Sequence, residues 1–185
     1  MRLDAPLRGP RLIIEGHRPG AEHGPYCGWM NDPEVLRGLE APVREYRPDD
    51  LAAFIAAMAA SPRDLLLGMY TGDGSHVGNI KLTITAEHRR GSIGLIVDPR
   101  HWGKGYATEA ISLVTDHAFE VLRLIKVTAG CYGSNPGSER SFLKAGFTVE
   151  ARRPMHHLDR GRWVECVLLG RIHPRPDTVP REPWS

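Results

Sequence analysis

The chain has 185 residues, of which 41% are hydrophobic, and this length supports one hydrophobic core rather than two independent ones. Its 24 basic and 22 acidic residues are mixed along the sequence and give a formal net charge of +2, which argues against a nucleic-acid or membrane surface. The three cysteines show no C-x-x-C spacing, so they indicate reduced thiols rather than a zinc or redox motif.

The distribution of prolines and apolar residues predicts where the domain ends. Residues 173–185 contain four prolines and little apolar content, which predicts a flexible tail behind a single domain over residues 1–172. The longest nearly apolar run, residues 51–60, is far shorter than the ~20 residues of a membrane span, and the N-terminus has no apolar export signal. We therefore expect a soluble, cytoplasmic protein that binds neither nucleic acid nor membrane.

The first third of the chain predicts a short strand at residues 12–15, followed by helices. Asp32 and Pro33 suit the cap and the first position of a helix, so residues 26–39 should form two short helices joined by a turn. A longer helix should begin at Pro48, because apolar residues follow it at spacings of three and four.

The spacing of apolar residues then changes to the alternation that is typical of strands. Residues 65–71 and 76–85 flank a Gly-Asp-Gly turn and predict a hairpin, with apolar residues alternating in its second strand. A third strand at residues 91–97 follows a polar turn. We expect these three strands to pair as an antiparallel meander.

Helices and strands alternate in the second half of the chain. Ala107, Ile111, Val114, Ala118 and Val121 recur at spacings of four and three, which predicts one buried helix face. The remaining expected elements are a strand at 124–130, a helix from Asn135-Pro136 to Gly146, and strands at 147–151 and 164–171 across a turn at 159–162.

A strand, a glycine-bearing turn and a helix follow one another over residues 93–120. Gly103 and Gly105 let the backbone turn tightly and approach a ligand without a Cβ in the way. The first N–H groups of the following helix have no partner inside it, and the helix dipole adds positive potential there. Such a turn suits a phosphate or pyrophosphate, although a purely structural turn would carry the same glycines.

Two motifs resemble the GNAT superfamily of acetyltransferases. The stretch R-H-W-G-K-G at residues 100–105 fits that family's Q/R-x-x-G-x-G/A coenzyme loop. The stretch N-P-G-S-E-R-S-F-L-K-A-G-F at residues 135–147 is similar to the corresponding segment of the RimJ/RimL-type branch. The resemblance covers roughly residues 65–171, and the stretch W-M-N-D-P-E-V in the first third looks like relatives that acetylate activated amino sugars.

The resemblance implies an α+β GNAT fold: a mixed, largely antiparallel sheet of six or seven strands, splayed between the strands at Ile93 and Leu124 and flanked by about four helices. It also implies acetyl-CoA as co-substrate and direct transfer of its acetyl group to a primary amine in a ternary complex. The residues expected to contact the coenzyme are Leu95, Ile96, Val97, Arg100, His101, Trp102, Gly103, Lys104, Gly105, Tyr106, Ala107, Thr108, Asn135, Ser138 and Lys144.

The proton donor to the departing thiolate is expected at Ser138. Many relatives use a tyrosine in this helix, but the aligned residue here is Phe142, which has no proton to give. The resemblance to the RimJ/RimL-type branch implies that Ser138 contacts the coenzyme sulfur, while an ordinary first-turn serine is the structural alternative. Tyr132 is the second candidate acid. Asn135 suits both a helix cap and a contact with the pantetheine arm.

A backbone N–H from residues 95–97 is the expected donor to the acetyl carbonyl, with a strand bulge at Gly94 freeing it. Glu150, Asp98, His156 and His157 are candidates for the general base, and each also has a structural explanation. Adjacent strand residues face opposite ways, so only one of the two histidines should face the site. We expect no metal, because no third ligand stands at a recognisable spacing.

The amine acceptor is the least determined part of the site. Trp29, Asn31, Asp32 and Asn79 are the expected substrate-binding residues, and the resemblance favours a nucleotide-activated amino sugar. A protein or peptide N-terminus and a small polyamine or antibiotic amine stay open, and we also allow for a homodimer. A non-catalytic acyl-CoA-binding domain is the alternative from another class. A dinucleotide enzyme is disfavoured because the loop lacks a third glycine.

Overall fold

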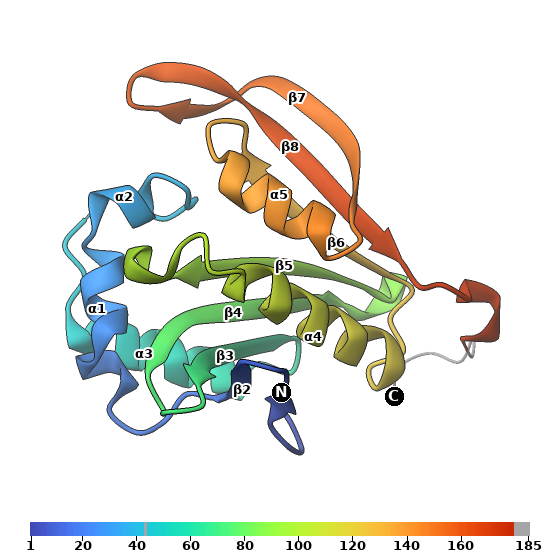
Figure 1. The fold of residues 1–185 in the computed structure, drawn as a ribbon, viewed down its shortest axis with the longest axis horizontal. Coiled ribbons are helices and arrows are strands. Elements are labelled where there is room, and N and C mark those ends of the chain that lie inside the picture. The colour runs from blue at the N-terminus through green and yellow to red at the C-terminus, as the bar shows by residue number, and fades with distance from the viewer. Residues whose placement is uncertain (43, 180–185) are drawn as a thin grey trace.

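The strands form one continuous mixed sheet in a computed structural model of the chain, which describes residues 1–42 and 44–179 (Figure 1). Its strands are β1 (Leu7–Arg8), β2 (Leu12–Gly16), β3 (Asp64–Thr71), β4 (His76–Thr85), β5 (Arg90–Val97), β6 (Lys126–Tyr132), β7 (Thr148–Asp159) and β8 (Arg162–Ile172). Their order is β1-β2-β3-β4-β5-β6-β8-β7. The described residues thus form eight strands rather than the six or seven predicted, because β1 has only two residues and too little sequence to show a pattern.

Five α-helices flank the sheet within the described residues, where about four were predicted. They are α1 (Pro25–Met30), α2 (Pro33–Leu36), α3 (Pro48–Ala60), α4 (Tyr106–Glu120) and α5 (Pro136–Lys144). The predicted cap of α2 is confirmed, since the Asp32 carboxylate accepts a hydrogen bond from the amide of Glu34 at 2.8 Å. Among the helices in the described part of the chain, none has the length and apolar character needed to cross a membrane.

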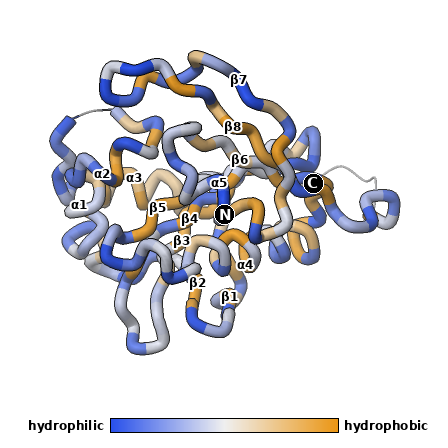
Figure 2. Tube along the Cα trace, turned by 45° about the horizontal axis from the view of Figure 1, so that its top comes forward, coloured by the Kyte–Doolittle hydropathy of each residue, from blue (hydrophilic) through white to orange (hydrophobic). Residues whose placement is uncertain are grey.

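Two hydrophobic clusters hold these elements together. The larger cluster lies between the sheet and α4, which buries Ala110, Ile111, Val114, Ala118 and Phe119. Figure 2 shows this concentration of hydrophobic residues along the central strands and α4. The prediction that Val121 belongs to the buried face is wrong, because α4 ends one residue earlier and the Val121 side chain is 58% exposed.

The smaller cluster joins α1, α2 and α3. It contains Tyr26, Trp29, Met30, Val35, Tyr46 and Leu51, and Ile96 of β5 packs against it. Leu95 and Val97 pack against the larger cluster instead, as the alternation of side chains along a strand requires. The two clusters therefore lie on opposite faces of β5.

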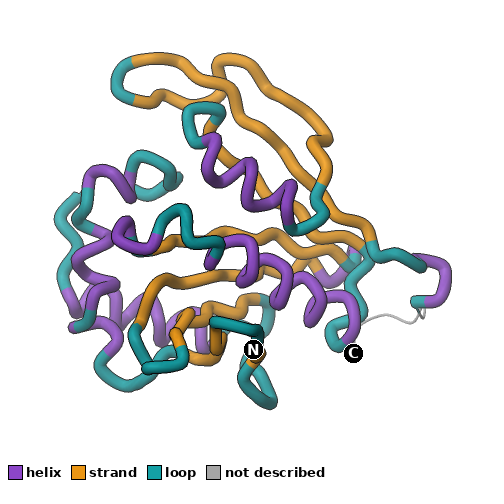
Figure 3. The backbone as a smooth tube through the Cα atoms, in the orientation of Figure 1, coloured by secondary structure: helices purple, strands orange, loops and turns teal. Residues whose placement is uncertain are grey.

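The sheet splits between β5 and β6, as predicted. These parallel strands pair only over Arg90↔Lys126, Gly91↔Val127 and Ser92↔Thr128, after which β6 continues with β8 and leaves β5. Three loops meet at the resulting opening: those after α2, after β5 and after β6 (Figure 3). The opening is where a ligand can reach the middle of the sheet.

The β7–β8 hairpin is longer than the sequence indicated and is irregular. Its pairing shifts register between Val149 and Ala151, and again between Arg153 and His157. Beyond it, the predicted tail begins with packed residues: the His173 ring lies against Phe119 with 5.3 Å between centroids. A 3-10 turn over Pro176–Thr178 leads to the buried Val179, and the rest of the predicted tail lies outside the described residues.

Candidate active site

The turn between β5 and α4 is built on one buried carboxylate and two glycines. The Asp98 carboxylate caps the 3-10 turn Pro99–His101 by accepting from the Arg100 amide at 2.9 Å. Gly103 and Gly105 follow with φ of 75° and 83°, the left-handed region that side chains with a Cβ rarely adopt. Both glycines of the predicted coenzyme loop are therefore required by the backbone itself.

In this turn, the backbone amides that have no hydrogen-bond acceptor begin after Trp102, which is later than predicted. The His101 amide donates to Asp98 O at 2.8 Å and the Trp102 amide to Pro99 O at 3.2 Å, so neither is available to a ligand. The first helical bond of α4 runs from Glu109 N to Gly105 O at 3.1 Å. The amides of residues 106–108 precede it and have no acceptor inside the helix. His101 and Trp102, which were predicted to contact the coenzyme, therefore offer it no free amide, and the amides open to a phosphate lie within residues 103–108.

Arg11 and Glu109 clamp the loop to the start of β2. The Glu109 carboxylate accepts the backbone amides of Arg11 and Leu12, each at 2.9 Å, and Arg11 Nε at 2.8 Å. Arg11 in turn donates to the carbonyls of Lys104 at 2.6 Å and Gly105 at 3.3 Å. The sequence did not reveal this clamp, because its partners lie more than 90 residues apart.

Arg100 and Lys104, the predicted positive charges of the loop, do not line the cleft in the described structure. The Arg100 guanidinium pairs with the Asp98 carboxylate at 2.6 Å, and this contact holds the pKa of Asp98 below its usual value. Asp98 is therefore an ionised structural group and a poor general base. Of the predicted basic contacts, Lys144 of α5 lines the cleft.

Backbone donors face the split in the sheet. The Asp98 amide donates to Val77 O of β4 at 3.0 Å, so alternate residues of β5 direct their amides toward β4. The amides of Leu95 and Val97 point the other way, into the space that β6 has left. The predicted bulge at Gly94 is wrong, because β4 and β5 pair without a register shift from Thr85↔Arg90 to Gly78↔Val97. Departure of β6, rather than a bulge, frees these donors.

The N-terminus of α5 lies across the split. Asn135 caps it, with its Oδ1 accepting from the Ser138 amide at 3.1 Å, and a Cβ on Gly38 would lie 2.8 Å from Asn135 Nδ2. Ser138 lies near the Cys131 thiol, whose pKa burial raises to about 11. Phe142 is fully buried in contact with Phe147, so no phenol stands on this helix turn.

Tyr132 and both histidines of β7 line the same cleft. The Tyr132 ring stacks on His157 with 3.9 Å between centroids, and burial raises the pKa of the phenol. The prediction that only one histidine faces the site is wrong. The register shift between Arg153 and His157, with Met155 at φ 50°, breaks the alternation that the prediction assumed.

Asn79 is the predicted substrate residue that reaches the cleft. It lies on β4 opposite Ile96 and is 2% exposed. Its Oδ1 lies 2.9 Å from His17 Nε2 and 2.8 Å from His76 Nε2, and burial lowers the pKa of both histidines. Its Nδ2 has no hydrogen-bond partner among the described residues. The side chain is thus fixed with a free donor.

Trp29, Asn31 and Asp32 stand behind the cleft and are not among the described residues that line it. Trp29 is buried with its ring against His76, 5.0 Å between centroids. Asn31 accepts from the Tyr46 amide at 2.9 Å and donates to Tyr46 O at 2.8 Å, while Asp32 caps α2. These residues support the wall of the cleft.

The cleft has a volume of about 1340 Å³ and runs from the glycine loop through the split to α2 and α3. Pockets for one drug-sized ligand span roughly 300–1,000 Å³. The space therefore suits an extended molecule together with a second, smaller one.

Comparison with known proteins agrees with this geometry. Residues 11–148 match the model of the acetyltransferase (GNAT) domain. The chain belongs to the GNAT acetyltransferase family. Members of this family use acetyl-CoA as the acetyl donor, so the chain is an acetyltransferase enzyme whose glycine loop and split-side amides fit a pyrophosphate and a thioester.

Several GNAT relatives share much of the chain. An uncharacterized N-acetyltransferase, YoaA of Bacillus subtilis, is 30% identical over 173 residues, covering 91% of this chain and 97% of that protein. Spermidine N(1)-acetyltransferase of Escherichia coli is 37% identical over 98 residues, covering 52% of this chain and 53% of that protein. Spermidine N-acetyltransferase of Vibrio cholerae, solved with CoA and spermine, has the same fold, with a TM-score of 0.81 at 19% identity over 89% of this chain and 97% of that one. The RimJ/RimL-type branch stays a prediction.

Proposed function

We propose that the protein transfers the acetyl group of acetyl-CoA to a primary amine of a small molecule by direct attack in a ternary complex. The observation that carries this proposal is one cleft that combines the glycine loop, the split-side amides of β5 and the fixed donor of Asn79. The loop amides would hold the pyrophosphate, and the split would admit the pantetheine arm. The Leu95 and Val97 amides would then face the acetyl carbonyl and stabilise negative charge developing on its oxygen.

Ser138 is the proposed donor to the departing sulfur. It stands in the first turn of α5 beside the split, and the nearby Cys131 thiol stays protonated because burial raises its pKa. Tyr132 is the alternative donor, since it also lines the cleft. Asn135 fixes the helix turn that presents Ser138 and approaches the loop after α2 at Gly38, so it would align the coenzyme side with the acceptor side.

Charge in the cleft favours an acceptor with few positive charges. Three carboxylates line it, against five lysine or arginine side chains. Two of these carboxylates are neutralised locally, Glu34 by Arg37 at 3.3 Å and Asp50 by Arg44 at 3.1 Å. A polyamine with several charges would find few free anions here, although relatives with that substrate exist.

The donor of Asn79 favours an acceptor that carries an oxygen. A buried N–H without a partner gains most from a ligand that supplies an acceptor atom. A hydroxyl, ether or phosphate oxygen beside the amine would serve, which agrees with an amino sugar, free or nucleotide-activated. A peptide N-terminus is the second candidate, because its carbonyl oxygen could take the same position.

Steady-state assays of purified protein with acetyl-CoA test the proposal. The acceptors should be an amino sugar, its nucleotide-activated form, spermidine and a short peptide, with CoA release and the mass of the acetylated product as readouts. We expect kcat/KM to be highest for an amino sugar. A preference for spermidine would overturn the acceptor assignment, and coenzyme binding with no transfer to any amine would favour an acyl-CoA-binding protein.

A further inference from the structure

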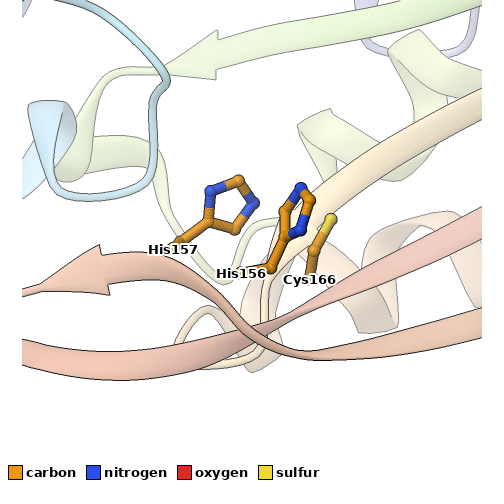
Figure 4. A group of neighbouring side chains, drawn as sticks. All are labelled: His156, His157 and Cys166. Carbon is orange, nitrogen blue, oxygen red and sulfur yellow. The ribbon is translucent and has the colours of Figure 1, made fainter.

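Three side chains of the types that bind metals lie close together in the lining of the cleft. His156 and His157 come from β7 and Cys166 comes from β8, and their nitrogen and sulfur atoms lie within 4.8 Å of one another (Figure 4). All three line the cleft, and Cys166 is 5% exposed. The expectation of no metal rested on the lack of a third ligand at a recognisable spacing, and the hairpin supplies that ligand from its other strand.

The backbone is distorted where the two histidines lie. Adjacent residues of a regular strand face opposite sides of the sheet, yet the His156 and His157 rings are 4.8 Å apart in an edge-on arrangement. The register shift between Arg153 and His157 makes this possible, with Met155 held at φ 50° although it is not a glycine. Strained, left-handed residues of this kind persist where the surrounding structure fixes them, and they cluster at ligand sites.

We propose that His156, His157 and Cys166 form a binding site for a borderline-soft divalent metal ion such as Zn²⁺. Two imidazoles and a thiolate are a donor set that zinc prefers, and three protein ligands leave a fourth position open. Ligand atoms at the usual zinc bond lengths stand roughly 3.3–3.8 Å apart in a tetrahedron, so metal binding would draw the present set, which lies within 4.8 Å, together by about 1 Å.

Glu40 would orient one of the metal ligands without binding the metal itself. Its carboxylate lies 3.3 Å from His157 Nδ1, and the side chain of His157 is 9% exposed. A carboxylate on one ring nitrogen fixes the tautomer and leaves Nε2 for the metal, which is the usual arrangement around zinc-bound histidines. The Tyr132 ring, stacked on His157, fixes the plane of the same imidazole.

Metal binding by protein without a polyhistidine tag, after treatment with a chelator, tests the site. Titration calorimetry with Zn²⁺ should show one equivalent bound. Co²⁺ in its place should give the intense visible bands of tetrahedral coordination and a sulfur-to-cobalt charge-transfer band. The readout does not depend on catalysis, so the proposed acetyl transfer can fail while this site stands, or the reverse.

Variants identify the ligands. Cys166→Ser should abolish the charge-transfer band, His156→Ala should weaken Zn²⁺ binding, and Glu40→Gln should weaken it roughly tenfold, the scale found for partners of metal-bound histidines. Cys27→Ser, which removes a thiol from α1, is the matched control and should bind Zn²⁺ as the wild type does.

His156 is exposed, so His156→Ala keeps the test valid if Cys166→Ser does not fold. Equal affinity of the wild type, Cys166→Ser and His156→Ala would overturn the site, as would cobalt binding without a sulfur band.

Discussion

Individual residues of this enzyme divide between those that line the cleft and those that support its wall. Asn79 and Ser138 line the cleft, whereas Trp29 and Asn31 are packed behind it. The types of these residues could be read from the sequence, but not the directions of their side chains. Two substitutions test the first group.

Ser138→Ala should lower kcat about tenfold to a thousandfold, the range in which proton donors and charge-stabilising groups act. The Kd for acetyl-CoA should change little, because contact with the sulfur strengthens only as negative charge develops there. Ser141→Ala is the matched control on the same helix, since the Ser141 hydroxyl bonds back to Gly137 O at 2.9 Å. Single-turnover kinetics measure the effect, and wild-type turnover in Ser138→Ala would transfer the role to Tyr132.

Asn79→Ala should raise KM for the amine acceptor by roughly tenfold and leave the Kd for acetyl-CoA unchanged, because one buried hydrogen bond to the acceptor is lost. The side chain faces the same way as Ile96, toward the α1–α3 cluster, and away from the α4 side. Steady-state kinetics with the best acceptor, together with calorimetry for the coenzyme, separate the two effects. Equal losses for both substrates would place Asn79 in the scaffold only.

Elements were predicted more reliably than their irregularities. The meander, the α4 loop and the cap of α5 follow from local signals: alternation, glycines before a helix, and Asn before Pro. The Arg11–Glu109 clamp and the bulge before His157 do not, because each depends on a partner distant in the sequence or on a backbone distortion without a residue signature. The split was expected from the family resemblance, and the structure shows it as three residue pairs followed by divergence.

The loop between β5 and α4 requires glycine at the position before the helix. Gly105→Ala places a Cβ at φ 83°, which costs about 1 to 2 kcal/mol, so the loop should relax and coenzyme affinity should fall on the order of tenfold. Gly16→Ala is the matched control, because a Cβ there meets nothing within 4 Å and φ is not positive. Calorimetry with acetyl-CoA measures the difference, and wild-type affinity in a folded Gly105→Ala protein would remove the loop from the coenzyme site.

In the described part of the chain, one sheet joins two hydrophobic clusters. The proposed coenzyme loop rests on the large cluster under α4, whereas the proposed acceptor side rests on the small cluster of α1, α2 and α3. The polar contacts of His17, His76 and Asn79 lie on the side of the small cluster, where Asn79 is buried and the two histidines are half-buried. The free energy of unfolding should therefore depend on the charge state of His17 and His76.

Burial lowers the pKa of both His17 and His76 below the ordinary value of 6.5, with the amide of Asn79 acting against it in each case. Above pH 6.5 both rings are neutral in the folded and unfolded chains. As the pH falls through 6.5, the unfolded chain takes up protons that the folded chain resists, so the free energy of unfolding decreases until the folded pKa values are reached. With two such groups, the free energy of unfolding can change by at most about 2.7 kcal/mol per pH unit.

Urea unfolding at a series of pH values from 8 to 5 measures this dependence. These limits lie roughly 1.5 units on either side of the ordinary histidine pKa. The other groups facing the two rings are Glu22 and Tyr26 at His17, and Arg18, Tyr70 and Trp29 at His76, and none of them has an ordinary pKa in this range. In a His17→Gln, His76→Gln variant, amide donors can still reach Asn79 Oδ1 but cannot titrate, so the slope should become shallower. His117, whose pKa burial also lowers, contributes equally to both proteins and cancels in the comparison. Identical slopes for the wild type and the double variant would show that His17 and His76 do not govern the acid sensitivity of the protein.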